Sequence, residues 1–259
     1  DIQALTAAAV QHEDHGPRRG EAGRHMHPEL AHHAVDRDRL VAQPCRERVL
    51  NPRPVIYVLA GVNGGGTSSL GGAVLREAGM AWFNPDDWSR ALQAAGRSRE
   101  SADADAWQEG QRRLKAAIAA GESFAFETTL GGRSVTATLV EAARTHDVLV
   151  WYVGLDSVAR HLERVALRVR HGGHDIPAAK IRERWLGSMA NLVRLVPHAA
   201  GIQVFDNSTA VPEGEPLRAP RLLAVIEAGR LRWPPSEALD RVPRWAVPVV
   251  EAGLGERPG

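Results

Sequence analysis

The stretch VIYVLAGVNGGGTSSL, residues 55–70, decides the fold. It opens with an apolar, β-branched run over 55–59, continues into a glycine-rich loop and leads into a helical segment over 70–78. Glycines let successive backbone N–H groups turn toward one anion, and the N-terminus of a following helix faces that anion with its positive end. This order of strand, loop and helix predicts a phosphate-binding loop. The alternative is a glycine-rich turn that binds no ligand.

The loop matches the motif G-x-x-x-x-G-K-[ST] at every defined position except one. Gly61 and Gly66 fit its glycines, and Ser68 takes the position of the hydroxyl that binds magnesium. Thr67 stands where the motif has its lysine. The residues predicted to bind nucleotide or phosphate in this stretch are Gly61, Asn63, Gly64, Gly65, Gly66, Ser68 and Ser69.

Length and composition indicate an ordinary soluble globular protein. The 259 residues allow one α/β domain of moderate size with extensions, or two small domains. Hydrophobic residues make up 44% and charged residues 24%, and the net charge of +1 gives no bulk attraction to nucleic acid or membranes. The single cysteine, Cys45, excludes an internal disulfide and suits a reducing cytoplasm. The sequence has neither a membrane-length apolar run nor the pattern of a signal peptide. We therefore expect a cytoplasmic protein without nucleic-acid or membrane partners.

Three regions differ in character. Residues 1–53 are polar and rich in histidine and arginine, which favours a solvated extension over a metal site because no cysteine lies at zinc-finger spacing. Residues 54–210 alternate apolar strands with helices, as in an α/β domain with a mainly parallel sheet. Residues 211–259 contain a β-hairpin and a tail rich in proline and tryptophan, which packs over the sheet edge or stays partly loose. The predicted strands cover 55–59, 81–84, 123–126, 148–153, 202–208, 221–226 and 230–233. Helices are expected over 70–78, 102–120, 135–145, 157–170 and 177–194.

Two carboxylates follow short apolar strands. Asp86 comes after the strand over 81–84, and Glu127 comes directly after the strand over 123–126. Acidic residues at the carboxyl ends of parallel strands lie on the ligand side of the sheet. Asp86 can there accept a proton from a substrate hydroxyl or cap a helix, and we assign chemistry to Asp86 and capping to Asp87. Glu127 either holds magnesium-bound water or a substrate hydroxyl, or is a solvated residue at a helix start.

Basic side chains gather further along the chain. Arg160, Arg164 and Arg168 lie four residues apart, so they share one face of a predicted helix that leads into Gly172-Gly173-His174. A basic helix followed by a glycine hinge suits a mobile lid whose guanidinium groups close over a transferring phosphate. The alternative is a solvated arginine face. Two residues that could add hydrogen bonds or charge beside Glu127 are Thr129 and Arg133.

The motifs GVNGGGTSS, FNPDD, FAFETTLGGR, RVALRVRHGGHDIP, IRERW and VFDNS, in that order, resemble the zeta-toxin-like P-loop kinases. The resemblance covers about residues 54–210 and points to the branch often labelled predicted ABC-type ATPase. It implies a P-loop NTPase-type three-layer fold with a helical lid, and a phosphotransferase that uses Mg²⁺ and ATP or GTP. Zeta toxins phosphorylate UDP-N-acetylglucosamine and are blocked by a small antitoxin. The implied partners are therefore a sugar or sugar-nucleotide acceptor and an antitoxin protein, with residues 1–50 as an alternative antitoxin-like piece.

The resemblance also implies a role for each matched residue. Asp86 would be the base that activates the acceptor hydroxyl, and Ser68 and Glu127 would hold the metal. The residues implied to bind the acceptor are Asp86, Glu127, Thr129, Arg133, His174 and Arg184. The residues implied to serve the transferring phosphate are Arg164, Arg168 and Arg170, with Arg164 and Arg170 in catalytic roles.

Two positions depart from the family pattern. Gly131 falls where the founding toxins carry an arginine, so a free sugar or another small alcohol is an alternative acceptor. Thr67 replaces the lysine that spans the β- and γ-phosphates, and neither Lys115 nor Lys180 offers an obvious substitute. Loss of such a charge contact costs roughly 3–4 kcal/mol, or 100- to 1000-fold in rate. We predict weak nucleotide binding and little turnover, from an introduced Lys→Thr change or in a natural pseudokinase. The other classes open are a nucleotide-binding module without chemistry and a nucleic-acid kinase, which the near-neutral charge disfavours.

Overall fold

The computed structural model describes residues 53–68, 81–173, 175–209 and 219–255. The chain divides into two units, Asp1–Pro52 and Arg53–Gly259, and every described residue belongs to the second. The extension predicted over 1–53, apart from Arg53 itself, and the helix predicted over 70–78 lie outside the described residues.

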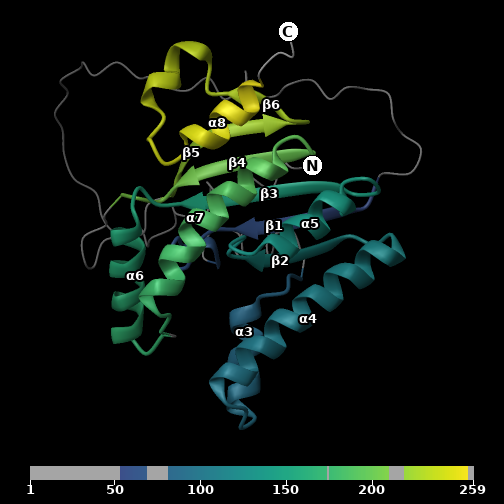
Figure 1. Cartoon of the computed structure of the whole chain (residues 1–259), viewed down its shortest axis with the longest axis vertical. Coiled ribbons are helices and arrows are strands. Elements are labelled where there is room, and N and C mark those ends of the chain that lie inside the picture. Colours follow the sequence, from purple (N-terminus) through teal and green to yellow (C-terminus); the bar gives the residue numbers. More distant parts are fainter. Residues whose placement is uncertain (1–52, 69–80, 174, 210–218, 256–259) are drawn as a thin grey trace, which may run out of the picture. The chain divides into compact units, whose positions relative to one another are not determined.

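Six strands form one sheet in the order β2-β1-β3-β4-β5-β6 (Figure 1). Their bounds are β1 (Val55–Ala60), β2 (Phe124–Thr128), β3 (Asp147–Gly154), β4 (Gly201–Asp206), β5 (Arg221–Glu227) and β6 (Arg230–Trp233). Strands β1 to β4 pair in parallel, whereas β5 runs antiparallel to β4 and β6 antiparallel to β5. The parallel strands end at one edge of the sheet, where Ala60 lies beside Thr128 and Tyr152. The α/β fold predicted from the sequence, with its mainly parallel sheet and C-terminal hairpin, is confirmed.

The strands in the middle of the sheet are the most apolar ones. In β3 every residue after Asp147 is buried, and in β1 the last three residues are buried. Near-continuous β-branched and aromatic runs are typical of strands that have neighbours on both sides in a parallel sheet. The edge strand β6 instead alternates exposed and half-buried residues. The pattern of the sequence thus predicts the position of a strand in the sheet as well as its presence.

Helices connect the parallel strands and cover the sheet. Their bounds are α3 (Pro85–Ala94), α4 (Arg99–Ala120), α5 (Arg133–Ala142), α6 (Val158–Arg170), α7 (Ala178–Leu195), the 3₁₀ helix η2 (Ser236–Arg241) and α8 (Val247–Leu254). Helices α5, α7 and α8 lie over the face of the sheet nearest the viewer in Figure 1, while α3 and α4 pack on each other below β2. Because the helix predicted over 70–78 lies outside the described residues, the third layer of the fold remains a prediction.

Local signals in the sequence account for several helix ends. Ser98 accepts a hydrogen bond from a backbone N–H of α4, and Ser157 does the same for α6. Gly121 ends α4 in the left-handed conformation, with φ of 66°, as the sequence predicts for a C-cap glycine.

The structure differs from the prediction at residues 81–84 and decides between two alternatives for the C-terminal tail. Residues 81–84 do not form a strand, since only Phe83 pairs, in a single bridge with Phe126. Pro85 follows at once as the first residue of α3, which leaves no room for a longer ladder. Of the two alternatives for the tail, packing on the sheet holds for residues 235–255: they form η2 and α8, and the ring of Trp245 lies 6.4 Å from that of Tyr152, centroid to centroid.

Candidate functional site

A cleft of about 1010 Å³ opens at the edge of the sheet where the parallel strands end. It is lined by the glycine-rich loop after β1, the end of β2, the start of α3, one face of α4, and parts of α6 and α7. The predicted site residues in its lining are Gly61, Asn63, Gly64, Gly66, Thr67, Ser68, Asp86, Glu127, Thr129, Arg164, Arg168 and Arg184. Residues from six segments of the sequence therefore meet in one place.

The remaining predicted residues do not line this cleft or lie outside the described chain. Gly65 is buried within the loop, whereas Arg133 and Arg170 are exposed at the start of α5 and the end of α6. Arg170 lies two residues after Arg168 on α6, so its side chain is rotated by about 200° around the helix axis and is directed away from the cleft. The geometry gives no support to acceptor binding by Arg133 or catalysis by Arg170. Ser69 and His174 lie outside the described residues.

The glycines of the loop are there for steric reasons. Gly64 and Gly66 have φ of 85° and 91°, in the left-handed region that side chains rarely adopt. A Cβ on Gly61 would lie 2.4 Å from the carbonyl oxygen of Val153, closer than real atoms approach. The backbone N–H of Gly65 donates to the carbonyl of Val62 at 2.9 Å, which closes a tight turn. The loop is therefore compact, and its shape depends on glycine at these positions.

Thr67 is buried in the loop. Its side chain is only 6% exposed, and its Oγ1 lies 3.1 Å from the position of a Cβ on Gly61. The hydroxyl therefore faces back toward the start of the loop. Threonine is uncharged, and its hydroxyl is directed back into the loop. It therefore brings no positive charge to a phosphate in the cleft.

Glu127 is bonded to two side chains from other elements. Ser68 Oγ donates to its Oε1 at 2.7 Å, and Asn84 Nδ2 donates to its Oε2 at 2.8 Å. Asn84 also caps α3, because its Oδ1 accepts from the backbone N–H of Asp86 at 2.8 Å and of Asp87 at 3.4 Å. The carboxylate, the loop and the start of α3 are thus held in register by three polar side chains.

The surroundings of Glu127 favour its protonated form. Burial raises the pKa of this carboxyl from its ordinary value of 4.5 to about 7, and the hydrogen bond from Ser68 opposes that rise. The charges of Asp86 and Asp87 add to it, whereas the charge of Arg168 opposes it. Because Asp86 and Asp87 lie near the Glu127 carboxyl, a bound cation would reduce the repulsion among these three groups.

The oxygen atoms of Ser68 and Glu127 suit the magnesium ion that the resemblance implies. Mg²⁺ prefers oxygen ligands and is usually held by one or two protein groups, waters and phosphate oxygens of the substrate. A divalent cation would also favour the ionised form of Glu127. Among the described residues, no group of three or more histidine, cysteine or acidic side chains is arranged to hold a metal by itself. The donors fit a metal that arrives with phosphate.

Asp86 and Asp87 differ in their surroundings. Both are exposed in the first turn of α3, but Asp86 lines the cleft, whereas Asp87 forms an ion pair with Arg90 outside it. The prediction that Asp87 caps the helix is wrong, because Asn84 occupies the cap position. A cap residue with a proline directly after it and two acids in the first turn is a signal that the sequence does carry.

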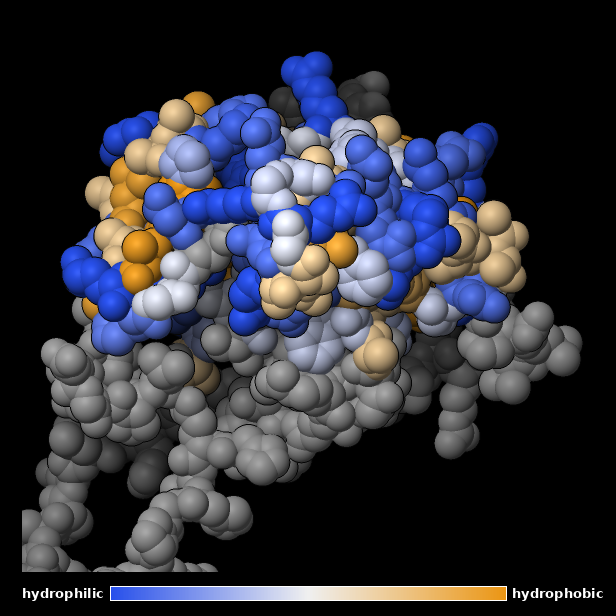
Figure 2. Space-filling model, turned by 90° about the horizontal axis from the view of Figure 1, so that it is seen from below, coloured by the Kyte–Doolittle hydropathy of each residue, from blue (hydrophilic) through white to orange (hydrophobic). Residues whose placement is uncertain are grey.

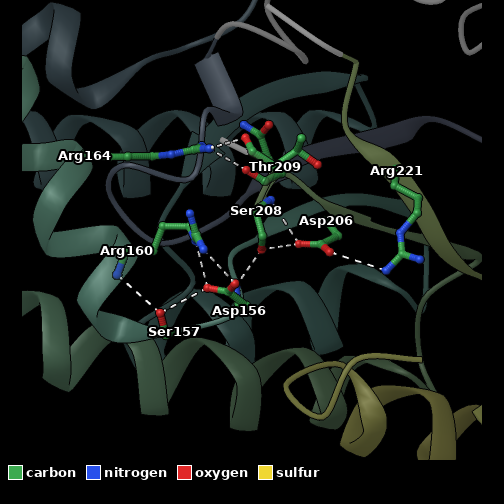
Figure 3. Close-up of polar contacts among 9 residues, drawn as sticks. Asp156, Ser157, Arg160, Arg164, Asp206, Ser208, Thr209 and Arg221 are labelled. Carbon is green, nitrogen blue, oxygen red and sulfur yellow. Dashed lines mark hydrogen bonds and ion pairs between the residues drawn. The ribbon is translucent and has the colours of Figure 1, made fainter. Parts of the chain in front are cut away.

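A polar network joins the start of α6 to the end of β4 (Figure 3). Arg160 donates to both oxygens of Asp156, at 2.9 and 3.1 Å, so this arginine is engaged beside the cleft and does not line it. The backbone N–H of Asp156 donates to Ser208 Oγ at 2.8 Å. Arg164, one turn further along α6, donates to the carbonyl oxygens of Asn207 at 2.6 Å and Thr209 at 3.3 Å. The segment after β4 therefore fixes the direction of Arg164.

Several residues of the site were not identified from the sequence. Asn207 Nδ2 donates to the carbonyl of Gly65 at 2.9 Å, although the polar end of the last core strand did predict a place at this rim. Lys180 of α7 lines the cleft and forms an ion pair with Glu183 at 3.2 Å, so one of the chain's two lysines does lie in the cleft. Trp107 lines the cleft from α4 and is 53% exposed.

One more contact crosses the cleft. Arg99 at the start of α4 donates to the backbone carbonyl of Asp175, which precedes α7. The two sides of the cleft are therefore joined at this end, and only the tertiary fold reveals it.

Hydrophilic side chains predominate on the surface seen from below in Figure 2, with hydrophobic groups confined to small patches. None of the helices that the structure describes has the length and apolar character needed to cross a membrane.

A mainly parallel sheet with a glycine-rich loop after a central strand, and with acids and arginines at the same edge, is the arrangement of a P-loop type of α/β fold. A chain of the AvrRxo1-ORF1:AvrRxo1-ORF2 complex with sulphate ions is similar to this one, at 16% identity and a TM-score of 0.54, over 74% of this chain and 64% of that one. A chain of the same complex with ATP is similar at 15% identity and a TM-score of 0.54, over 81% and 67%. A chain from the PezAT chromosomal toxin-antitoxin system of Streptococcus pneumoniae has a TM-score of 0.44 at 13% identity, over 62% and 70%.

These likenesses are at the level of the fold. The P-loop NTPase-type α/β fold that the motifs predict is shared with the two AvrRxo1-ORF1:AvrRxo1-ORF2 chains. It spans 64% of the length of the sulphate-bound relative. No protein-family model matches the sequence, and no curated protein matches it.

Proposed function

We propose that this chain is a small-molecule kinase that transfers the γ-phosphate of ATP or GTP to a hydroxyl group of a sugar or sugar nucleotide. The observation that carries the proposal is the 2.7 Å hydrogen bond between Ser68 of the glycine loop and the half-buried Glu127. This bond supports the proposal because it joins the glycine-rich loop to the carboxylate proposed to hold the metal, and Asn84 links that carboxylate to Asp86 in the same cleft. Phosphoryl transfer needs these parts together, because its catalysis consists largely of positioning and charge stabilisation.

ATP or GTP is proposed as the donor because the sequence of the loop matches all but one of the defined positions of the phosphate-binding motif. One similar structure contains ATP. Bound Mg²⁺ would neutralise charge on the phosphate oxygens, and Ser68 and Glu127 are the residues that would hold it. UDP-N-acetylglucosamine is the acceptor that the family resemblance favours, with a free sugar as the alternative.

The remaining side chains of the cleft have separate tasks. Asp86 would accept the proton of the acceptor hydroxyl as that oxygen attacks the γ-phosphorus. Arg164 and Arg168 would stabilise the negative charge of the transferring group and help to exclude water. Arg164 is already directed by the carbonyls of Asn207 and Thr209, so little reorganisation precedes the reaction.

Thr67 sets the expected rate. Because it is buried and uncharged, it cannot span the β- and γ-phosphates as lysine would. Loss of one such contact costs roughly 3–4 kcal/mol, equivalent to 100- to 1000-fold in turnover. We therefore infer slow or absent transfer by the chain as it stands.

The test compares the chain with Thr67→Lys for phosphate transfer to a panel of sugars and sugar nucleotides, with products identified by mass. The lysine form should be 100- to 1000-fold faster, and Asp86→Asn in the lysine form should abolish that gain. If the lysine form binds ATP but transfers nothing to any acceptor, the chain is a nucleotide-binding module without chemistry. If it binds no nucleotide either, the assignment as a kinase is wrong.

A protein partner belongs to the same proposal. The similar solved structures are of AvrRxo1-ORF1 in complex with AvrRxo1-ORF2. A kinase that poisons its own cell needs an inhibitor, so we propose an antitoxin that acts with this chain in the cytoplasm. Two experiments would test this. The chain should co-purify with the product of a neighbouring reading frame, and that product should relieve the growth inhibition that the Thr67→Lys form causes.

A further inference from the structure

Asn63 is held by two helices at once. His161 of α6 donates from Nδ1 to the Asn63 carbonyl oxygen at 2.9 Å. Arg184 of α7 donates from Nη1 to the Asn63 side-chain oxygen at 2.7 Å. Asn63 lies between Gly61 and Gly64 in the phosphate loop, so both helices are tied directly to that loop.

The contact from α6 fixes the loop backbone. A carbonyl oxygen only accepts, so Nδ1 of His161 carries the proton and the ring is held in one tautomer. His161 is 1% exposed, and its Nε2 has no hydrogen-bond partner among the described atoms. The next loop residue packs on the same helix, because a Cβ on Gly64 would lie 3.0 Å from the His161 carbonyl oxygen. The ring is thus used for a single bond, and that bond goes to the loop.

The contact from α7 fixes a positive charge at the loop. The stem of Arg184 packs against Gly131, where an added Cβ would lie 2.9 Å from Arg184 Cγ. With its stem against Gly131 and its guanidinium bonded to Asn63, Arg184 lines the cleft. The neighbouring loop has threonine in the place of lysine. The amide oxygen of Asn63 therefore accepts a charged hydrogen bond from a different helix than the one that holds its carbonyl.

We propose that Asn63 is a positioning residue that fastens α6 and α7 to the phosphate loop, so that the order of the loop and its affinity for nucleotide depend on His161 and Arg184. In its second part the inference rests on the proposed function, which places nucleotide at this loop. A loop held in its binding shape before the ligand arrives has a smaller ordering cost at binding. The same bond holds the positive charge of Arg184 at the loop, within the cleft.

The two bonds can be removed separately. Asn63→Ala removes the bond to Arg184 and leaves the bond to His161, which uses the backbone. His161→Leu removes the other bond, whereas His161→Asn keeps an N–H donor close to the position of Nδ1. Arg182→Gln is the matched control, because Arg182 is an exposed residue of α7 that does not line the cleft.

Affinity for a fluorescent ATP analogue with Mg²⁺ is the first measurement. Asn63→Ala, Arg184→Gln and His161→Leu should each weaken binding roughly tenfold or more. His161→Asn should restore most of that loss, and Arg182→Gln should change binding less than twofold. The double variant of Asn63 and Arg184 should bind about as weakly as Arg184→Gln alone, because the two residues act through one bond. Fully additive losses, or equal loss in both variants of His161, would overturn the proposal.

Hydrogen exchange of the loop amides over 61–68 in the ligand-free protein is the second measurement. Exchange should speed up several-fold in Asn63→Ala and His161→Leu and stay unchanged in Arg182→Gln. Unchanged exchange in the first two variants refutes the fastening of the loop, whatever the protein binds. If exchange is faster in these variants but the protein binds no nucleotide, the proposed function is refuted, and so is the claim that nucleotide affinity depends on His161 and Arg184. The fastening of the loop by the two helices would then still hold.

Discussion

Replacing Glu127 by glutamine removes a carboxyl group that the folded protein holds in a largely buried place. The structure raises the pKa of this group from 4.5 to about 7, mainly through burial. The unfolded chain has no such burial, so there the pKa is ordinary. The difference between the two states makes the free energy of unfolding depend on pH.

The sign and size follow from these two values. Below pH 4.5 the carboxyl is protonated in both states and contributes no difference. Between pH 4.5 and 7 the folded protein keeps a proton that the unfolded chain has lost, so stability falls as pH rises. The shift of about 2.5 pH units, from 4.5 to about 7, corresponds to roughly 3 kcal/mol at 1.36 kcal/mol per unit.

The assay is urea unfolding of the protein and of Glu127→Gln at pH 4, 6 and 8. Because glutamine does not titrate, the unaltered protein should lose about 3 kcal/mol relative to this variant between the lowest and the highest pH. Glu141→Gln is the control, since that glutamate is exposed in an ion pair with Arg144 and should show little change. A difference between protein and Glu127→Gln that stays constant with pH would show that Glu127 is not held as described.

Three further changes test the scaffold around the cleft. Gly154→Ala should cost about 1–3 kcal/mol in thermal unfolding, because a Cβ there would lie 2.3 Å from the ring of Trp245; an unchanged melting temperature would mean that this packing is loose. Asn84→Ala should cost about 1 kcal/mol for the lost cap, measured by urea unfolding, and Asn84→Ser should recover part of it. Gly66→Ala should cost about 1–3 kcal/mol and weaken ATP binding, because φ is 91° and the new Cβ would lie 2.5 Å from Nδ2 of Asn207; a variant with normal stability and binding would contradict the described loop.

The sequence predicts the fold well where its signal is local. The β-branched runs of β1 and β3 and the turn after β5 are properties of a few consecutive residues, and the structure confirms them. Helix periodicity also separates two predicted residues: Arg168 and Arg170 lie about 200° apart on α6, and Arg168 lines the cleft whereas Arg170 does not.

Contacts between distant segments could not be predicted in the same way. Nothing near Asn63 in the sequence indicates that its amide meets Arg184, 121 positions later, or that its carbonyl meets His161. Lys180 is one turn before Arg184 on the same helix, and it reaches the cleft only because α7 begins at this edge of the sheet. Which cations surround the loop is decided by tertiary packing, whereas which residues form the loop is decided by the sequence.

The pairing of α3 with α4 has a mechanical consequence. The two helices extend together away from the sheet in Figure 1. Arg113 of α4 lies 5.0 Å from the ring centroid of Phe83 and 4.6 Å from that of Trp88, which locks the pair at its root. Because Arg99 at the start of α4 also donates to the backbone carbonyl of Asp175 before α7, the pair is held at both ends, and the width of the cleft is set by these two contacts together.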